Sequence, residues 1–202
     1  MSIFKRLFGR KSDKTEEQIP NHERGKYMPE VKLPADERFT INFNANGGKF
    51  LYCENLQEIN DSFQNILSEN NWTDKTALIL DDRLTRKFEG FQLKTSKNPS
   101  DATFFFSTCE YLISDDGSLL ISSNQIAEKK LKELPSNFII FATTSQFVET
   151  IGEGLKGIKE KNKSKIPTNI TTIKHFKTVE DKDFMTYGSS SKNLYLLLLE
   201  DL

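Results

Sequence analysis

Short apolar runs alternate along this chain with segments in which apolar residues recur at helical spacing. The apolar runs predict strands, and the spacing of three or four residues predicts helices. This alternation is typical of an α/β domain with a mainly parallel sheet and helices on both faces. The run at 194–199 is apolar throughout, which predicts a central strand buried on both sides. The predicted strands are 49–53, 76–81, 104–106, the arms of a hairpin around 115, 137–144, 168–176 and 192–201. The predicted helices lie within 34–48, 55–71, 82–88, 125–135 and 145–161.

The first 33 residues have a different pattern from the rest, so we expect a partly flexible N-terminal extension at 1–33 and the α/β domain at 34–202. Ile3, Phe4, Leu7 and Phe8 share one helical face beside basic residues. This face fits an amphipathic hook for a membrane surface or a partner. The alternative is a frayed or locally docked terminus, which we favour because two helical turns bury little apolar surface.

Composition excludes several classes of protein. The 28 basic residues balance 29 acidic ones, so no overall field favours nucleic acid. Two cysteines and two histidines cannot form a disulfide framework, an iron–sulfur cluster or a multi-histidine site, so we expect no metal. The longest apolar run is too short to cross a bilayer, and we find no signal-peptide core, so we expect a cytoplasmic protein.

The stretch 109–125 places Asp115, Asp116, Gly117 and Ser118 between two apolar runs. The two aspartates are candidate catalytic groups, as a nucleophile or as acid and base, and Gly117 and Ser118 are candidate ligand-binding residues. Adjacent residues of a strand point to opposite faces, so the carboxylates would not share a proton. A type I′ turn centred on Asp116 and Gly117 explains the same residues without chemistry, and residue patterns alone favour it.

Further candidates for binding an anion follow later strands. Thr143, Thr144 and Ser145 come where a strand is predicted to end and a helix to begin. An N-cap alone also explains Ser145, and we favour that role for this residue. A second group precedes the last strand, where a polar turn is the alternative to an oxyanion cradle. It consists of Gly188, Ser189, Ser190, Ser191 and Lys192.

Two further patterns have simpler explanations. Gly152, Gly154 and Gly157 match the dinucleotide-binding spacing, but no strand directly precedes them, so we expect these glycines to allow close packing against the sheet. The lysines at 156, 159, 161, 163 and 165 could attract an anion, but they also suit a solvated helix C-terminus, which we favour.

The order of several pieces resembles the lactate-utilisation protein C family, the LUD domain, over roughly 35–202. These pieces are the acidic turn at 115–118, Leu134-Pro135, Ser145-Gln146, the segment 177–181 and the final strand. The resemblance implies a fold like that of ribose-phosphate isomerases, glucosamine-phosphate deaminases and CoA transferases. It also implies a role with iron–sulfur partner proteins in oxidising L-lactate to pyruvate. In the related CoA transferases a carboxylate is the nucleophile, which singles out Asp115.

The chain departs from the family's pattern at three places. The family's usual Glu is an Asp in this chain, shorter by one methylene group. Lys177 and Thr178 stand where the family has an Arg-Thr pair, and lysine keeps the charge but loses bidentate binding of a carboxylate. The loop at 187–191 lacks the family's histidine. We count Lys177 and Thr178 among the ligand-binding candidates.

We therefore expect an accessory or ligand-binding component of lactate oxidation, with its pocket formed by 114–118, 143–145 and 177–192. The chain has no flavin or nicotinamide motif, so we expect no cofactor in it and iron–sulfur clusters only on its partners. The expected ligand is a small carboxylate or phosphate-bearing molecule. Two alternatives stay open: an enzyme acting on a CoA thioester or a sugar-phosphate-like substrate, with Lys177 or Lys192 holding the anion, and a regulatory module that senses a carboxylate.

Overall fold

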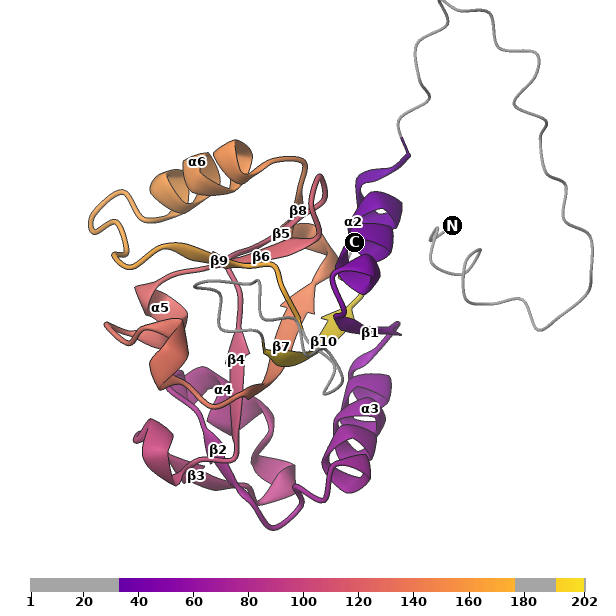
Figure 1. The fold of residues 1–202 in the computed structure, drawn as a ribbon, viewed down its shortest axis with the longest axis vertical. Coiled ribbons are helices and arrows are strands. Elements are labelled where there is room, and N and C mark those ends of the chain that lie inside the picture. Colours follow the sequence, from indigo (N-terminus) through magenta and orange to yellow (C-terminus); the bar gives the residue numbers. More distant parts are fainter. Residues whose placement is uncertain (1–32, 177–191, 202) are drawn as a thin grey trace, which may run out of the picture. The chain divides into compact units, whose positions relative to one another are not determined.

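The computed structural model describes residues 33–176 and 192–201 (Figure 1). Contacts divide the chain into 1–33 and 34–202, and the account below concerns the second unit. The expected amphipathic N-terminal segment, together with Lys177, Thr178, Gly188, Ser189, Ser190 and Ser191, lies outside the described residues.

The larger of two sheets has six parallel strands in the order β1-β10-β7-β4-β2-β3 (Figure 1). β10 lies between β1 and β7, which confirms the central position predicted from its apolar run. The α/β class with a mainly parallel sheet is also confirmed. The strands are β1 (Lys49–Cys53), β2 (Thr76–Leu78), β3 (Lys94–Ser96), β4 (Phe104–Thr108), β7 (Asn137–Thr143) and β10 (Asn193–Leu199).

A second sheet of four short strands has the order β8-β5-β6-β9. The predicted hairpin around 115 is its centre, with β5 and β6 antiparallel, β8 parallel to β5, and β9 antiparallel to β6. The sequence pattern did not separate these strands from the main sheet, because an apolar run does not reveal its pairing partner. The strands are β5 (Tyr111–Ile113), β6 (Ser118–Ile121), β8 (Phe147–Val148) and β9 (Thr171–Ile173).

Five α-helices and four 3₁₀ helices lie in the described part of the chain. The first three occur where apolar spacing predicts helices, and Asn55 and Asp81 cap α3 and α4 by accepting hydrogen bonds from backbone N–H groups. The α-helices are α2 (Ala35–Ala45), α3 (Leu56–Glu69), α4 (Asp82–Lys87), α5 (Ser123–Ile126) and α6 (Ile151–Lys161). The 3₁₀ helices are η1 (Glu89–Phe91), η2 (Pro99–Asp101), η3 (Leu131–Glu133) and η4 (Thr144–Gln146).

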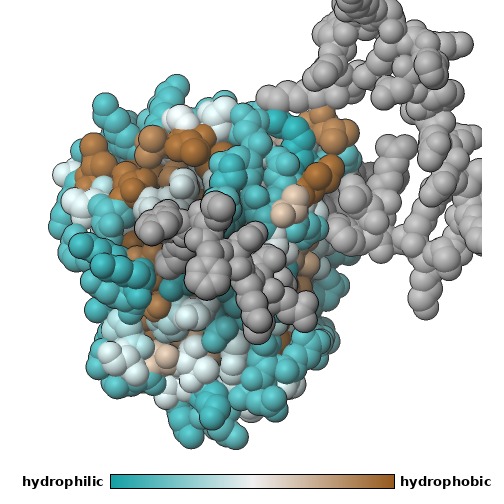
Figure 2. All heavy atoms as spheres, viewed as in Figure 1, coloured by the Kyte–Doolittle hydropathy of each residue, from teal (hydrophilic) through white to brown (hydrophobic). Residues whose placement is uncertain are grey.

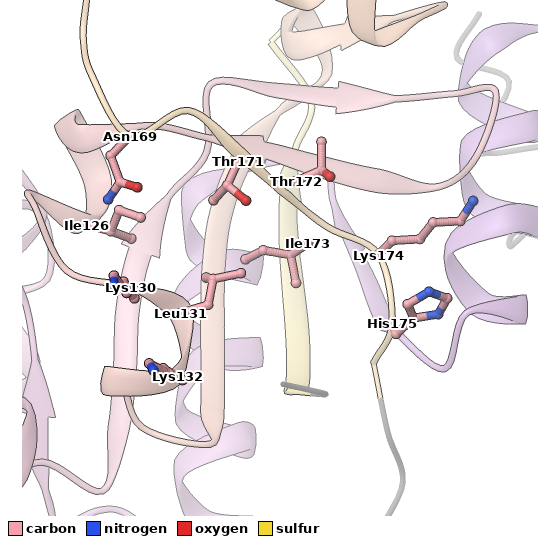
Figure 3. Close-up of a pocket in the computed structure, with 10 residues that line it drawn as sticks. All are labelled: Ile126, Lys130, Leu131, Lys132, Asn169, Thr171, Thr172, Ile173, Lys174 and His175. Atoms are coloured by element: carbon pink, nitrogen blue, oxygen red, sulfur yellow. The ribbon is translucent and has the colours of Figure 1, made fainter. Parts of the chain in front are cut away.

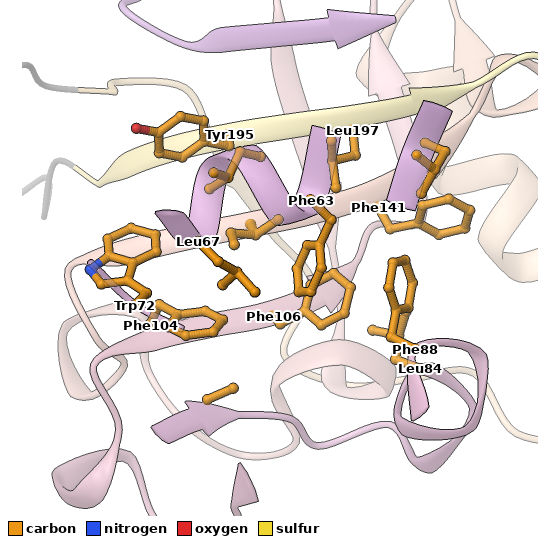
Figure 4. Close-up of a cluster of buried hydrophobic side chains, with 14 of the residues drawn as sticks. Phe63, Leu67, Trp72, Leu84, Phe88, Phe104, Phe106, Phe141, Tyr195 and Leu197 are labelled. Atoms are coloured by element: carbon orange, nitrogen blue, oxygen red, sulfur yellow. The ribbon is translucent and has the colours of Figure 1, made fainter. Parts of the chain in front are cut away.

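Helices cover both faces of the large sheet, as predicted. On one face, alternate strand residues such as Phe106 and Leu197 pack with Phe63 of α3 and with Phe88, the C-cap residue of α4, in one apolar cluster (Figure 4). The rings of Phe63 and Phe106 are 4.8 Å apart at their centroids. On the other face, Phe39 and Phe43 of α2 contact Phe50 of β1. The abundant phenylalanines thus serve packing.

Three predicted elements are wrong in extent. The helix expected over 125–135 ends at Ile126, since Ala127 has a φ of 53° that a right-handed helix cannot continue through. The helix expected from Ser145 begins at Ile151 after a 3₁₀ turn and β8, and its N-cap is Thr150, which accepts a hydrogen bond from Glu153 N. The strand expected over 168–176 is regular only at Thr171–Ile173.

The expected packing role of the glycines in α6 is confirmed at two of three positions. A Cβ at Gly157 would collide with the ring of Tyr111, and one at Gly154 would lie 2.9 Å from Leu120 Cδ2. The helix therefore approaches β5 and β6 through its glycine side, which leaves Ile151 and Leu155 exposed. Figure 2 shows apolar surface gathered in the region of α6. Among the described helices, none is long and apolar enough to cross a membrane.

Candidate functional site

The hairpin between β5 and β6 turns through 114–117, and its details differ from the predicted type I′ turn. That turn requires positive φ at both central residues, but only Gly117 has one, at 69°. The N–H of Gly117 donates to Ile113 O over 2.9 Å, and the strands pair from Ile113 and Ser118 outward, so the loop has four residues. A Cβ at Gly117 would collide with the backbone N of Phe43, so close packing against α2 also requires glycine here.

The two candidate carboxylates at this turn contact other side chains of the domain. Asp116 Oδ1 accepts hydrogen bonds from Ser118 N at 3.0 Å and from Ser118 Oγ at 2.6 Å. Its Oδ2 lies 3.4 Å from the Nζ of Lys174. Asp115 accepts from Arg38 Nη1 at 2.5 Å. Asp116 and Ser118 therefore stabilise the turn itself, as the simpler interpretation expects.

Arg38 of α2 joins two carboxylates from separate loops. Its second guanidinium nitrogen, Nη2, donates to Glu149 Oε2 at 2.5 Å. The hydrogen bond to Glu149 raises the pKa of Arg38 most, and the hydrogen bond to Asp115 raises it further. Burial acts in the opposite direction but is outweighed. The Nδ2 of Asn42, one helical turn along, donates to the carbonyls of Ser114 and Asp115. The helix α2 thus holds the turn from one side.

Thr143, Thr144 and Ser145 do lie at the end of β7, but they contact a carboxylate of the same chain. Thr144 Oγ1 donates to Asp201 Oδ1 at 2.9 Å, and Ser145 donates to the two oxygens of Asp201 from its N–H and its hydroxyl, at 2.8 and 2.7 Å. Burial acts to raise the pKa of Asp201, yet these hydrogen bonds outweigh it and leave the pKa below its ordinary range. The group can hold an anion, and in this structure the anion is Asp201.

Lys192 is buried at the opposite end of the sheet. Its Nζ donates to the carbonyls of Leu134 and Pro135, each at 3.0 Å, and burial lowers its pKa to about 8. Because β7 and β10 run parallel in register, Lys192 and Thr144 lie beyond opposite strand ends, roughly 25 Å apart. The expectation that 114–118, 143–145 and Lys192 line one hollow is therefore wrong for the described residues.

A cavity of about 430 Å³ lies where β4 and β7 end, and we call it the strand-end cavity. Ligands of open α/β sheets bind at the carboxyl ends of strands, so this is the expected place for a site. Its lining includes both cationic and anionic groups together with amides. The lining residues are Asp81, Arg83, Leu84, Lys87, Thr108, Cys109, Glu110, Asn124, Gln125, Phe141, Gln146, Lys161 and Asn162.

The charges of this cavity differ in how they are paired. Asp81 binds Arg83 through both carboxylate oxygens, and Glu110 accepts from Ser122 Oγ at 2.6 Å. The ammonium groups of Lys87 and Lys161 each lie over an aromatic ring, at 4.3 and 4.5 Å from its centroid. Neither has a carboxylate within ion-pair distance in the described part of the chain.

Gln146 holds together the segments that separate the Asp201 group from the strand-end cavity at the end of β7. Its Oε1 accepts from Thr143 N at 2.8 Å, and its Nε2 donates to Cys109 O at 2.6 Å. Burial strongly raises the pKa of the Cys109 thiol, so this cysteine is a packing residue in the wall rather than a nucleophile. The residues that line the cavity come from α4, β4, α5, β7, η4 and α6 and from positions next to these elements.

Sequence reasoning missed most of this cavity. Lys161 belongs to the lysine run noted above, but the pattern favoured a solvated helix end. Lys87 carried no signal, because its partner Phe141 is distant in the chain. The feature that could have drawn attention was the Ser145-Gln146 pair after a buried strand. Among residues 33–176 and 192–201, no cluster of three or more His, Cys, Asp or Glu side chains is placed to hold a metal ion.

The chain is similar to a known protein family and to a solved crystal structure. The model of the LUD domain family matches residues 37–199. A crystal structure of a DUF162 family protein from Deinococcus radiodurans superposes with a TM-score of 0.57, at 13% sequence identity, over 84% of this chain and 100% of that chain. At this identity the likeness concerns the fold alone. None of the curated proteins matches the chain.

Proposed function

The chain belongs to the LUD-domain family, and we propose that it is the ligand-binding component of a lactate-utilisation system, in which iron–sulfur partner proteins oxidise L-lactate to pyruvate. Membership in the family supports a lactate-utilisation-related function. The sequence has no flavin or nicotinamide motif, so we assign the two electrons released by the oxidation to the partners. The role of this chain is then to hold the small carboxylate.

The observation that carries the proposal is the pair of ammonium groups at the strand-end cavity. Lys87 and Lys161 come from the last turns of α4 and α6 and reach the same cavity. A cation above an aromatic face keeps its charge while part of its hydration is lost, so it is prepared to bind an anion. A carboxylate ligand would supply the counter-charge that the described residues do not.

The neighbouring groups suit a hydroxy or keto acid. Thr108, Asn124 and Gln125 border the cavity and offer hydroxyl and amide groups. Polar groups of this kind bind a hydroxyl or a carbonyl next to the carboxylate and fix its orientation. A volume of about 430 Å³ exceeds that of lactate or pyruvate, which leaves room for water or for a partner's side chain.

The test is calorimetric titration of L-lactate and of pyruvate into the full chain and its variants K87Q and K161Q. Since a hydrogen bond to a charged group contributes about 1.5–3 kcal/mol, each variant should bind at least about 10-fold more weakly. K156Q is the matched control, because Lys156 lies on α6 outside the cavity, beside Glu160, and should change affinity less than about twofold. Unaltered affinity in both K87Q and K161Q, or no binding of either acid at millimolar concentration, would contradict the proposal.

A further inference from the structure

A second and larger cavity lies on the outer side of β9, and we call it the β9 cavity (Figure 3). Its volume is about 580 Å³, and it is bordered by β9 on one side and by the chain from α5 through η3 on the other. The lining residues are Ile126, Lys130, Leu131, Lys132, Asn169, Thr171, Thr172, Ile173, Lys174 and His175.

Among the described residues, the charged side chains of this lining are basic. Lys130, Lys132 and Lys174 line the cavity, and no Asp or Glu within 33–176 and 192–201 does. Only Lys174 has a carboxylate nearby, at 3.4 Å from Asp116 Oδ2, whereas the ammonium groups of Lys130 and Lys132 have no ion-pair partner among the described residues. The strand-end cavity, by comparison, combines three cations with two carboxylates. The β9 cavity therefore favours a ligand of greater negative charge than a monocarboxylate.

Backbone and hydroxyl groups add hydrogen-bonding capacity. Among the described strands, β9 is the terminal strand of its sheet and pairs with β6 alone, so one row of its N–H and C=O groups points away from that sheet. Thr171 brings a hydroxyl to the side of β9 that faces η3, whereas the side chain of Thr172 points to the opposite face of the strand (Figure 3). Backbone N–H groups, hydroxyls and ammonium groups together are the usual partners of phosphate oxygens in proteins.

Two groups singled out by sequence analysis contact residues in or next to the lining of this cavity, although neither group lines it. Asp116 fixes Lys174 at one end, and Lys192 lies behind η3, where its Nζ donates to Leu134 O.

The base of the cavity is apolar. Figure 3 shows Ile126, Leu131 and Ile173 between the flanking basic residues. An apolar base beneath cationic walls suits a molecule with a charged end and an organic body better than it suits a bare ion. We propose that the β9 cavity binds a phosphate monoester with an organic body, as a site separate from the strand-end cavity.

The experiment titrates the full chain with AMP, ribose 5-phosphate, inorganic phosphate and adenosine, measuring affinity by calorimetry at 100 mM salt. AMP tighter than ribose 5-phosphate identifies a nucleotide ligand, and the reverse identifies a sugar phosphate. Adenosine should not bind, because it lacks the phosphate. Inorganic phosphate that binds as tightly as both esters would overturn the role of the apolar base, and no binding of any phosphate probe below about 10 mM would overturn the site.

Paired variants locate the binding. K130Q/K132Q should weaken binding of the tighter ester at least about 10-fold, whereas K156Q/K159Q, which removes the same charge from α6, should change it less than about twofold. Equal losses in the two variants would indicate general electrostatic attraction and overturn the proposal. K130Q/K132Q should leave L-lactate affinity unchanged, and K87Q should leave ester affinity unchanged, so failure of one site is distinguishable from failure of the other.

Discussion

The Nη1 atom of Arg38 lies 2.5 Å from the Oδ1 atom of Asp115, although 77 residues separate the two in the chain. The side chain of Arg38 is 13% exposed and also contacts Glu149. The residue that the family resemblance singles out as a nucleophile therefore anchors the hairpin to α2. A carboxylate held by arginine has a lowered nucleophilicity, because its charge is already compensated.

This relationship predicts that D115N destabilises the domain. The variant leaves the partly buried Arg38 with one carboxylate fewer, so the free energy of unfolding should fall by about 1–2 kcal/mol in a urea titration. In a double-mutant cycle with R38Q, the two losses should be strongly non-additive. L-Lactate binding should be unchanged in D115N, because Asp115 lies at the far end of β5 from Glu110 and the strand-end cavity. Loss of lactate binding with unaltered stability would instead assign a ligand role to Asp115.

The turn at Gly117 predicts a large effect of one methyl group. In G117A the new Cβ collides with the backbone of α2, and the residue must keep a φ of 69°. The free energy of unfolding should therefore fall by about 3 kcal/mol or more. G152A is the matched control, because the nearest atom to its Cβ would be Thr150 Oγ1 at 3.7 Å. Alanine in that helix should be neutral or slightly stabilising. Similar thermal midpoints for the two variants would contradict the close packing of α2 on the hairpin.

Because Lys192 is buried, we expect the free energy of unfolding to rise with pH in the alkaline range. Because burial lowers its folded pKa to about 8, while the unfolded lysine has its ordinary value near 10.4, the unfolded state binds more protons between these two pH values. Stability should therefore increase from about pH 8 to about pH 10.4, by up to about 3 kcal/mol. Urea titrations at pH 7.5 and pH 10 should show this gain in the native chain relative to K192M, in which the titrating group is absent. The same pH dependence in both proteins would contradict the buried position of the ammonium.

The lowered pKa of Asp201 leads us to expect a stability that also rises with pH, here in the acid range. Its pKa is lowered in the folded state, so the stability that it contributes is present above its unfolded pKa of about 3.9 and is lost as the pH falls through the folded value. D201N should be less stable than the native chain at pH 7, and the difference should shrink progressively below about pH 4. A difference between the two proteins that is constant from pH 7 to pH 3 would show that Ser145 and Thr144 do not stabilise the ionised form. The stability difference between the native chain and D201N is measured from their thermal midpoints in matched buffers at each pH.

The elements whose pattern is local could be predicted from the sequence. Alternating apolar runs predicted the α/β class, and a run apolar at every position predicted that β10 lies between two other strands, since a strand covered on both faces has this composition. The end of α2 before Gly47 and the packing role of Gly154 and Gly157 follow equally from local preferences.

The sites depended on contacts between distant residues, which no local pattern encodes. Only the tertiary structure decided that Thr144 and Lys192 lie at opposite strand ends, because strand direction and register depend on pairing partners. The same holds for Asp201 beside Ser145, for Arg38 beside Asp115 and for the two cavities. Composition and periodicity determine which surfaces of each element are buried, whereas the placement of charged groups around a cavity is a property of the assembled fold.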